Sequence, residues 1–246
     1  MLEPSCRAYA IIILTLSVLI GASALADSAE EPAAGASING KPSMLVALTF
    51  DDGPSVYTDA ILDILEENGV RATFCVLGRR VVMYPDKVRR AAAMGCEVIG
   101  HSWDHTMLVN LTNEEMTRQI MDTHRAIALA TGVEPPMIYR APGGTISPRL
   151  LALSGELGFT LLHWTVGSND FALRDAKKIY KAVYYNTREG AIILCHDIYG
   201  ETVKAMRKVI PRLIEQGYRF VTVTELMRAY GDELSPGTVY RGHKDW

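Results

Sequence analysis

The feature that most constrains the fold is a regular alternation of short apolar runs with longer helical patterns, beginning at residue 44. Six helical patterns cover 58–68, 85–94, 113–130, 148–157, 176–187 and 203–216. Seven apolar runs between and around them read as strands, at 44–50, 72–77, 97–100, 136–140, 160–164, 191–195 and 219–223. Continuous apolar strands that alternate with helices are typical of a parallel sheet covered by helices. The sequence therefore predicts one α/β domain, either a closed barrel or a doubly wound sheet, because periodicity does not distinguish the two.

The ends of the helical patterns carry the expected signals. Thr112 directly precedes the pattern at 113–130, and Glu115 lies three positions after Thr112, as in a capping box. A glycine follows each helical pattern, where a left-handed residue ends a helix. These glycines are Gly69, Gly95, Gly132, Gly158, Gly190 and Gly217.

The first 26 residues differ from the rest of the chain. An apolar run at 10–20 is too short for a comfortable membrane span. It is followed by small residues that end in Ala24, Leu25 and Ala26, a pattern that signal peptidase cleaves. We interpret 1–26 as a cleaved signal peptide; an uncleaved N-terminal anchor is the alternative.

The remaining boundaries follow from composition. Residues 27–42 are small and polar and include proline and glycine, which predicts a flexible linker. The predicted domain covers 43–230, and 231–246 forms a C-terminal tail. The formal net charge is −3 and no block of like charge occurs, so we expect no nucleic-acid partner. We expect no stable membrane span after signal cleavage, and a monomer.

Three cysteines remain after the predicted signal peptide. Cys75, Cys96 and Cys195 each lie in an apolar, strand-like run. Since buried cysteine behaves as a small hydrophobic residue, we expect core positions for all three.

Ionisable side chains follow five of the seven predicted strands. Sites of α/β proteins are built at the carboxyl ends of strands, so this distribution predicts a functional site there. These residues are Asp51, Asp52, His101, His105, Arg140, Asp170 and His196.

Two histidines and a pair of adjacent aspartates indicate a metal site. His101 and His105 are four positions apart, a spacing at which both imidazoles can reach one ion on a helical turn. Asp51 and Asp52 are adjacent, so that one carboxylate can bind metal while the other holds a water. Alone, each pattern has an ordinary structural reading, a strand end or a turn. Together they predict a site of two histidines and a carboxylate with an open position, the pattern of catalytic zinc.

Two further strand ends offer polar chemistry. His196 directly follows the run at 191–195 and could donate a proton to a leaving group, although an isolated histidine there is more often structural. Arg140 ends the run at 136–140 and could orient a carboxylate by a two-pronged contact.

Four short motifs, in this order, resemble the polysaccharide deacetylases of carbohydrate esterase family four, the NodB-homology family. They are TFDDGP at 49–54, HSWDH at 101–105, RAP at 140–142 and LCH at 194–196. The resemblance covers roughly residues 44–228. It implies a distorted (β/α) barrel with about seven parallel strands.

The resemblance also implies residue roles. Asp51 would be the general base, and Arg140 would position it. His196 would protonate the leaving sugar amine or hydroxyl. The metal ligands would be Asp52, His101 and His105.

The implied substrate contacts involve a second set of residues. The backbone N–H of Gly143, after Pro142, would stabilise the oxyanion, and Leu194 would line the pocket for the acetyl methyl group. We also assign Trp164 to substrate binding.

The chain departs from the family pattern at two motifs. Gly143 and Gly144 stand where the family often has an aromatic residue after the proline. In the fourth motif, commonly Asp-x-x-Asp-Trp, Gly167 replaces the first aspartate and Phe171 the tryptophan. If that aspartate orients Arg140 or tunes His196, then Asp170 or Asp197 must take its place, and we count Asp170 among the catalytic residues.

The expected activity is metal-dependent removal of acetyl groups from a sugar polymer, in the cell envelope or outside the cell. N-acetylglucosamine in peptidoglycan is the first substrate hypothesis, with chitin oligomers or acetylated xylan as others. Zinc is the expected ion, and cobalt or nickel would also suit such ligands. Two alternatives stay open, a sugar-binding pseudoenzyme and a metal-dependent hydrolase of another amide.

Overall fold

The computed structural model describes residues 37–38, 41–42 and 44–243. All of them belong to one compact unit, Glu31–Trp246. The predicted signal peptide lies outside the described residues, as does most of the predicted linker. Within that linker, β1 (Ser37–Ile38) pairs antiparallel with β2 (Lys41–Pro42).

The centre of the fold is a nine-stranded sheet in which every strand pair is parallel. The strands lie in the order β11-β7-β6-β5-β4-β3-β9-β8, and β10 pairs with β3. Their bounds are β3 Met44–Asp51, β4 Thr73–Val76, β5 Glu97–Gly100, β6 Ile138–Tyr139, β7 Thr160–Leu162, β8 Val166–Gly167, β9 Ile192–His196, β10 Tyr218–Val221 and β11 Val239–Tyr240.

The sheet curls on itself. β7 lies near one end of the strand order and β8 at the other, yet only residues 163–165 separate them in the chain. Such a short segment spans roughly 10–14 Å even when fully extended, so the two ends of the sheet come close. The predicted α/β class and the distorted barrel are therefore confirmed, and the seven predicted strands are all present. The sheet also extends past residue 230, the predicted end of the domain, because β11 pairs with β7.

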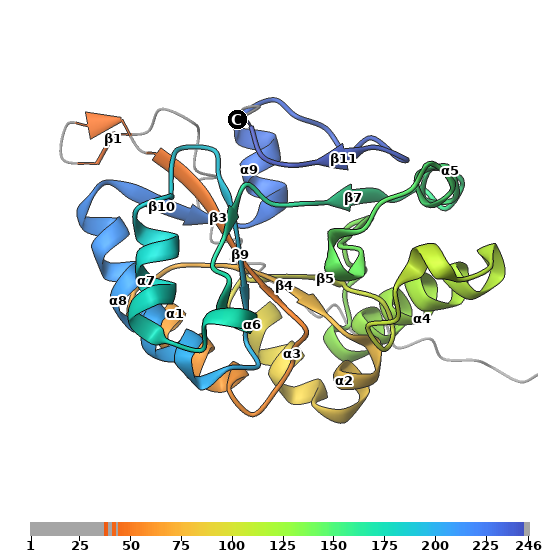
Figure 1. Ribbon diagram of the computed structural model, residues 1–246, viewed down its shortest axis with the longest axis horizontal. Helices are drawn as coiled ribbons and strands as arrows, with labels where there is room; N and C mark the ends of the chain where they lie inside the picture. Colours follow the sequence, from red (N-terminus) through yellow and green to blue (C-terminus); the bar gives the residue numbers. More distant parts are fainter. Residues whose placement is uncertain (1–36, 39–40, 43, 244–246) are drawn as a thin grey trace, which may run out of the picture. The chain divides into compact units, whose positions relative to one another are not determined.

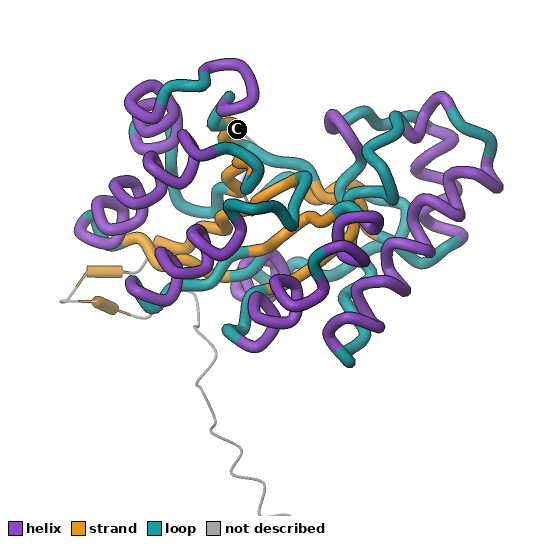
Figure 2. The backbone as a smooth tube through the Cα atoms, turned by 90° about the horizontal axis from the view of Figure 1, so that it is seen from below, coloured by secondary structure: helices purple, strands orange, loops and turns teal. Residues whose placement is uncertain are grey.

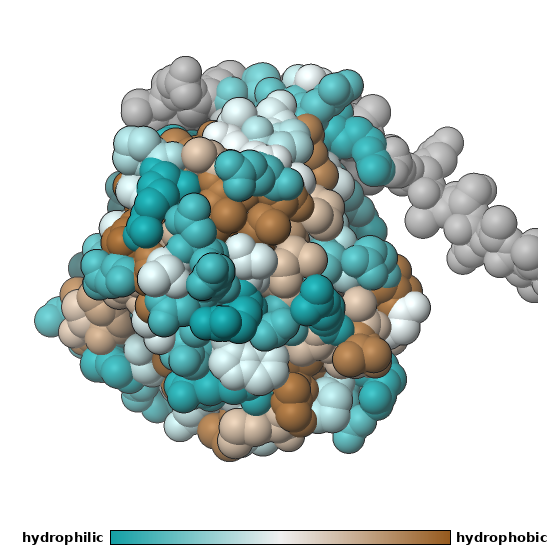
Figure 3. Space-filling view, turned by 90° about the vertical axis from the view of Figure 1, so that its right-hand side faces the viewer, coloured by the Kyte–Doolittle hydropathy of each residue, from teal (hydrophilic) through white to brown (hydrophobic). Residues whose placement is uncertain are grey.

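Helices pack against the outside of the curled sheet (Figure 1), and the strands run between helices on either side (Figure 2). Figure 3 shows one face of the molecule, on which hydrophobic side chains are interspersed with hydrophilic ones. The helices are α1 Thr58–Glu67, α2 Gly78–Met83, α3 Pro85–Ala93, α4 Asn113–Thr131, α5 Pro148–Glu156, α6 Asp170–Leu173, α7 Ala176–Tyr184, α8 Gly200–Glu215 and α9 Val223–Ala229, with 3-10 turns η1 Leu108–Asn110 and η2 Pro142–Gly144.

The helix ends match the sequence signals. Thr112 and Glu115 form the capping box at the start of α4, with both reciprocal hydrogen bonds present. All six glycines predicted to end helical patterns have positive φ, between 61° and 95°. Cys75, Cys96 and Cys195 are buried and free, as expected. No helix in the described part of the chain is long and apolar enough to cross a membrane.

The alternation of side chains along β3 explains where polar groups gather. Val46, Leu48 and Phe50 pack in the cluster between the sheet and the outer helices, whereas Leu45 and Ala47 pack on the inner face. The inner-face series then continues with polar residues, because successive side chains point to opposite faces. Thr49 and Asp51 thus lie on the inner face of the barrel, at the carboxyl end of its central strand.

Candidate active site

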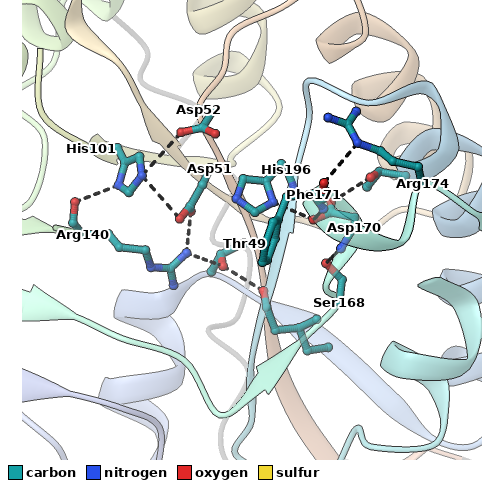
Figure 4. Close-up of polar contacts among 12 residues, drawn as sticks. Thr49, Asp51, Asp52, His101, Arg140, Ser168, Asp170, Phe171, Arg174 and His196 are labelled. Atoms are coloured by element: carbon teal, nitrogen blue, oxygen red, sulfur yellow. Dashed lines mark hydrogen bonds and ion pairs between the residues drawn. The ribbon is translucent and has the colours of Figure 1, made fainter. Parts of the chain in front are cut away.

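The functional side chains lie at the carboxyl edge of the sheet, where β3 and β9 run side by side. In their register His196 is opposite Asp51 and Leu194 is opposite Thr49. Alternation places all four on the same face of the sheet. Figure 4 shows the side chains that converge there from different strands.

Three predicted metal ligands come together at this edge. Potential ligand atoms of Asp52, His101 and His105 all lie within 4.8 Å of one another. Asp52 Oδ1 is 3.5 Å from His101 Nε2 and 3.4 Å from His105 Nε2. Ligand atoms about 2.1 Å from a tetrahedral zinc ion would lie roughly 3.4 Å apart. The spacing of these atoms therefore fits one small divalent ion.

The local chemistry also fits a cation. Asp52 Oδ1 is buried and has no hydrogen-bond partner among the described residues. The ring of His101 is 2.8 Å from the Arg140 carbonyl through Nδ1, so Nδ1–H donates to the carbonyl and Nε2 presents its lone pair. Burial lowers the pKa of His101 despite the carboxylates of Asp51 and Asp52, which favours the neutral ring that binds metal.

A buried arginine holds the second carboxylate of the pair. Arg140 is fully buried, and its Nη1 donates to Asp51 Oδ1 at 2.6 Å and to Thr49 Oγ1 at 2.7 Å. Its Nη2 donates to the His163 carbonyl at 3.1 Å. Burial alone would raise the pKa of Asp51, but the Arg140 charge and hydrogen bond outweigh it and hold that pKa below its usual value. Asp51 is therefore ionised at neutral pH and oriented.

On the other side of Asp51, a buried aspartate holds His196. Asp170 is fully buried and its Oδ1 lies 2.6 Å from His196 Nδ1. Asp170 Oδ2 accepts hydrogen bonds from the His196 backbone N–H at 2.8 Å and from the Thr202 hydroxyl at 2.7 Å. Burial lowers the pKa of His196, but the hydrogen bond and charge of Asp170 outweigh it and raise that pKa. With Nδ1–H directed at Asp170, the Nε2 atom of His196 is the one available to a reacting group.

The two glycines of the third motif give room to an aromatic ring. Gly143 and Gly144 have φ of 62° and 64°, and a Cβ on Gly144 would lie 2.5 Å from the Trp164 ring. The Arg140 guanidinium lies 5.8 Å from the centroid of that ring. Trp164 therefore lies against the loop that begins with the buried Pro142, beside the arginine of the site.

The structure distinguishes the two residues, Asp170 and Asp197, that could take the place of the missing first aspartate of the fourth motif. Asp170 contacts His196, as described. Asp197 instead hydrogen-bonds Thr58 at 2.5 Å, and burial raises its pKa to about 7. A Cβ on Gly167 would meet its nearest described neighbours, Trp164 and Asn169, only at 3.7 and 3.8 Å, so a side chain has room there.

Two hydrogen bonds of the site were not predicted from the sequence. Thr49 accepts a hydrogen bond from Arg140, and Thr202 donates one to Asp170. Thr49 had a usable signal, since it precedes Asp51 by two positions on one strand and so shares its face. Thr202 had none, because it lies on a helix that only the tertiary fold brings to Asp170.

Comparisons with known proteins show which proteins this chain is similar to. The polysaccharide deacetylase family model matches residues 39–162. The peptidoglycan-N-acetylglucosamine deacetylase PgdA of Listeria monocytogenes is 37% identical over 201 residues, which cover 81% of this chain and 42% of that protein. The chain thus spans less than half the length of that relative.

Solved structures show the same fold. A T48 deacetylase with substrate superposes with a TM-score of 0.76 at 35% identity, covering 80% of this chain and 96% of that one. A family 4 acetyl xylan esterase from Clostridium thermocellum, in complex with a cobalt ion, gives a TM-score of 0.75 at 34% identity, covering 80% and 98%. The extent of the family match and the identity to these relatives show that this chain belongs to the polysaccharide deacetylase family.

Proposed function

We propose that the protein hydrolyses N-acetyl groups of a polymer containing N-acetylglucosamine, with peptidoglycan as the first candidate. The observation that carries the proposal is the pairing of two oriented groups beside one metal triad. Asp51, held by Arg140, and His196, held by Asp170, lie on adjacent strands next to the three potential ligands. Amide hydrolysis needs a base for the water and an acid for the leaving amine, and this arrangement supplies both.

Asp52, His101 and His105 would hold the divalent ion. The bound ion would polarise the acetyl carbonyl and lower the pKa of water at the site. Zinc is the expected ion from the ligand types, and cobalt would also suit them; the esterase relative was solved in complex with a cobalt ion.

The protein side chains would handle the protons. Asp51 accepts a proton from the attacking water, and Arg140 keeps its carboxylate ionised and aimed. His196, protonated because Asp170 raises its pKa, donates a proton from Nε2 to the leaving amine. The backbone N–H of Gly143 stabilises the developing oxyanion.

Leu194 and Trp164 would form the apolar walls around the acetyl group. Leu194 is on the same strand face as His196, and Trp164 lies beside the Gly143–Gly144 loop.

We also propose export through the N-terminal segment, since the relative PgdA is named for peptidoglycan, a polymer outside the cell membrane. A monomer completes the proposal.

Acetate release tests the proposal. The substrates are N-acetylated chitooligosaccharides and purified peptidoglycan, with zinc supplied, and the variants are Asp51→Asn and the control Asp63→Asn. Asp63 is an exposed aspartate that pairs with Arg90 outside the site. We expect release by the wild type and by the control, and a loss of roughly 10²–10⁴-fold in Asp51→Asn. Stoichiometric metal binding without release from either substrate would contradict the proposal and favour a binding protein or another amide.

A further inference from the structure

Apart from the candidate active site, the molecule has a groove between α7 and α8, on the outside of the sheet. The groove has a volume of about 910 Å³. Five basic side chains line it, and none of the described residues that line it is acidic. The five are Lys177, Lys181, Lys204, Arg207 and Lys208. Since the whole chain has a net charge of −3, this concentration of positive charge is local and does not follow from composition.

Few carboxylates neutralise the groove. Lys204 is 3.7 Å from Glu201 and Arg207 is 3.3 Å from Glu67, and both acids are more than one-third exposed. Such exposed pairs are weak and are screened by salt. Of the side chains that the structure describes, no carboxylate forms an ion pair with the other three bases, Lys177, Lys181 and Lys208. The groove therefore presents a positive field to solvent.

Aromatic rings lie between the basic residues. Tyr180 and Tyr185 line the same groove, and Tyr185 is 70% exposed. Tyr180 stacks on Tyr184 at 5.1 Å, which holds its ring in place. A flat ring with an exposed face offers a packing surface for the apolar face of a sugar ring. Aromatic and cationic groups together suit a sugar polymer that carries negative charge.

The two helices that line the groove begin near residues of the active site. α8 begins at Gly200, shortly after His196, and α7 begins shortly after α6, which carries Asp170 (Figure 1). The first turns of these helices contribute Lys177 and Lys204 to the groove. Both helices therefore lead from the catalytic edge of the sheet along the side of the barrel.

Two ring contacts lie between the site and the segments that precede α7 and α8. The Tyr199 ring lies 5.9 Å from His196, and the Arg174 guanidinium lies over Tyr199 at 3.6 Å. A polymer whose acetylated sugar occupies the site can thus continue along α7 and α8.

We propose that the α7–α8 groove binds a carboxylate-bearing stretch of the peptidoglycan that the active site deacetylates. The inference rests on the proposed function for the identity of the polymer. The lysines pair with the carboxylates of the peptide stems, and the tyrosines pack against sugar rings. The groove acts in holding the insoluble polymer, and it leaves turnover of a short neutral oligosaccharide unchanged.

Cosedimentation with peptidoglycan sacculi stripped of phosphate polymers tests the groove. The variant is Lys177→Gln/Lys181→Gln/Lys208→Gln. The control, Arg118→Gln/Arg125→Gln/Lys178→Gln, removes the same charge outside the groove and includes the neighbouring Lys178 of α7. Loss of three exposed charge contacts is expected to weaken binding about tenfold at low salt. The control variant is expected to bind like the wild type, and acetate release from a neutral chitooligosaccharide is expected to stay unchanged in both.

The source of the negative charge is tested on the same sacculi. Amidation of their carboxylates is expected to weaken wild-type binding to the level of the groove variant. Equal binding by wild type and groove variant would overturn the proposal. So would wild-type binding that needs phosphate polymers and is absent from stripped sacculi. These readouts concern binding, so a failure of the proposed deacetylation would appear separately, as absent acetate release by the wild type.

Discussion

Two buried carboxylates of the site are each held by a side chain of opposite charge. Arg140 and Asp51 form one pair, and Asp170 and His196 form the other. An isolated buried charge is costly, so each partner fixes both the position and the ionisation of the other. The substitution of one partner should therefore change the titration of the one that remains.

Asp170→Asn tests the coupling between Asp170 and His196. The substitution keeps the shape but removes the charge that raises the pKa of His196. His196 then loses its proton at lower pH, so the alkaline limb of the kcat/KM profile should move toward acid pH. We expect kcat at neutral pH to fall about 10²-fold, the lower end of the effect of a general acid. Thr202→Val removes one hydrogen bond to Asp170 but keeps its charge, so the alkaline limb should not move toward acid pH; an Asp170→Asn profile identical to that of the wild type would contradict the assignment.

Arg140→Met tests the pair with Asp51. Without the guanidinium, Asp51 is a buried carboxylate with no cation beside it, and we expect a loss of about 3–5 kcal/mol in the free energy of unfolding at pH 7. The wild-type pKa of Asp51 is lowered, so its stabilising contribution is present above its unfolded pKa and is lost as pH falls through the folded one. In the variant, burial without the guanidinium raises the pKa of Asp51, so the carboxyl takes up a proton and the penalty of burying its charge fades as pH falls from 7 toward 4. The stability difference measured by urea unfolding should therefore shrink over this range. A constant difference between pH 7 and pH 4 would argue against this electrostatic explanation.

At the scale of elements, the loop after β3 packs directly on the loop after β9. A Cβ on Gly53 would lie 2.2 Å from the Asp197 carboxylate, which also bonds Thr58 at the start of α1. The hydroxyl of Ser55 donates to the Asp197 carbonyl at 2.5 Å. Gly53 is therefore required by close packing between the loop that carries Asp52 and the loop that follows His196.

Two glycine substitutions make a matched test of this packing. Gly53→Ala should lower the free energy of unfolding by about 1–3 kcal/mol, because the new methyl group overlaps a buried carboxylate. Gly167→Ala should change it by less than about 0.5 kcal/mol, because a Cβ there has only ordinary contacts. Thermal or urea unfolding measures both, and equal losses would show that the Asp197 carboxylate moves aside readily.

The strongly periodic elements could be predicted from the sequence, and the short ones could not. The long apolar runs gave β3 and β9, but two-residue strands such as β8 and β11 are too brief to show a period. α9 was missed although Thr222 and Glu225 form the same capping box as at α4. The capping box was present in the sequence, but we interpreted the apolar run at 219–223 as a strand and predicted no helix after it.

The sequence indicated which residues belong to the site, but it did not indicate which of them contact one another. Strand ends identified the polar residues, but nothing in the sequence shows that Arg140 bonds Thr49, 91 positions away, or that Thr202 bonds Asp170, 32 positions away. Such partners follow from strand order and sheet curvature, which periodicity leaves undetermined. The choice between Asp170 and Asp197 likewise depended on the fold.

At the scale of the molecule, the metal triad joins distant parts of the chain. Asp52 follows β3 directly, whereas His101 and His105 lie in the loop after β5, with β4 between these strands in the sheet. A bound ion would crosslink the two loops and would stabilise only the folded chain, where the three ligands are close together.

Metal-dependent melting tests this crosslink without relying on turnover. Free zinc at about 1,000 times its Kd should stabilise the wild type by about 4 kcal/mol, and chelation should reverse the effect. In His105→Ala one ligand is lost, so added zinc should raise the Tm much less. Asp52→Asn should have a higher Tm than the wild type without metal, because the amide removes a negative charge from a site where Asp52 Oδ1 is buried without a partner. It should also lose most of the zinc response. A zinc-induced rise in Tm that is equal in all three proteins would place the ion elsewhere and remove the basis for the proposed chemistry at this edge of the sheet.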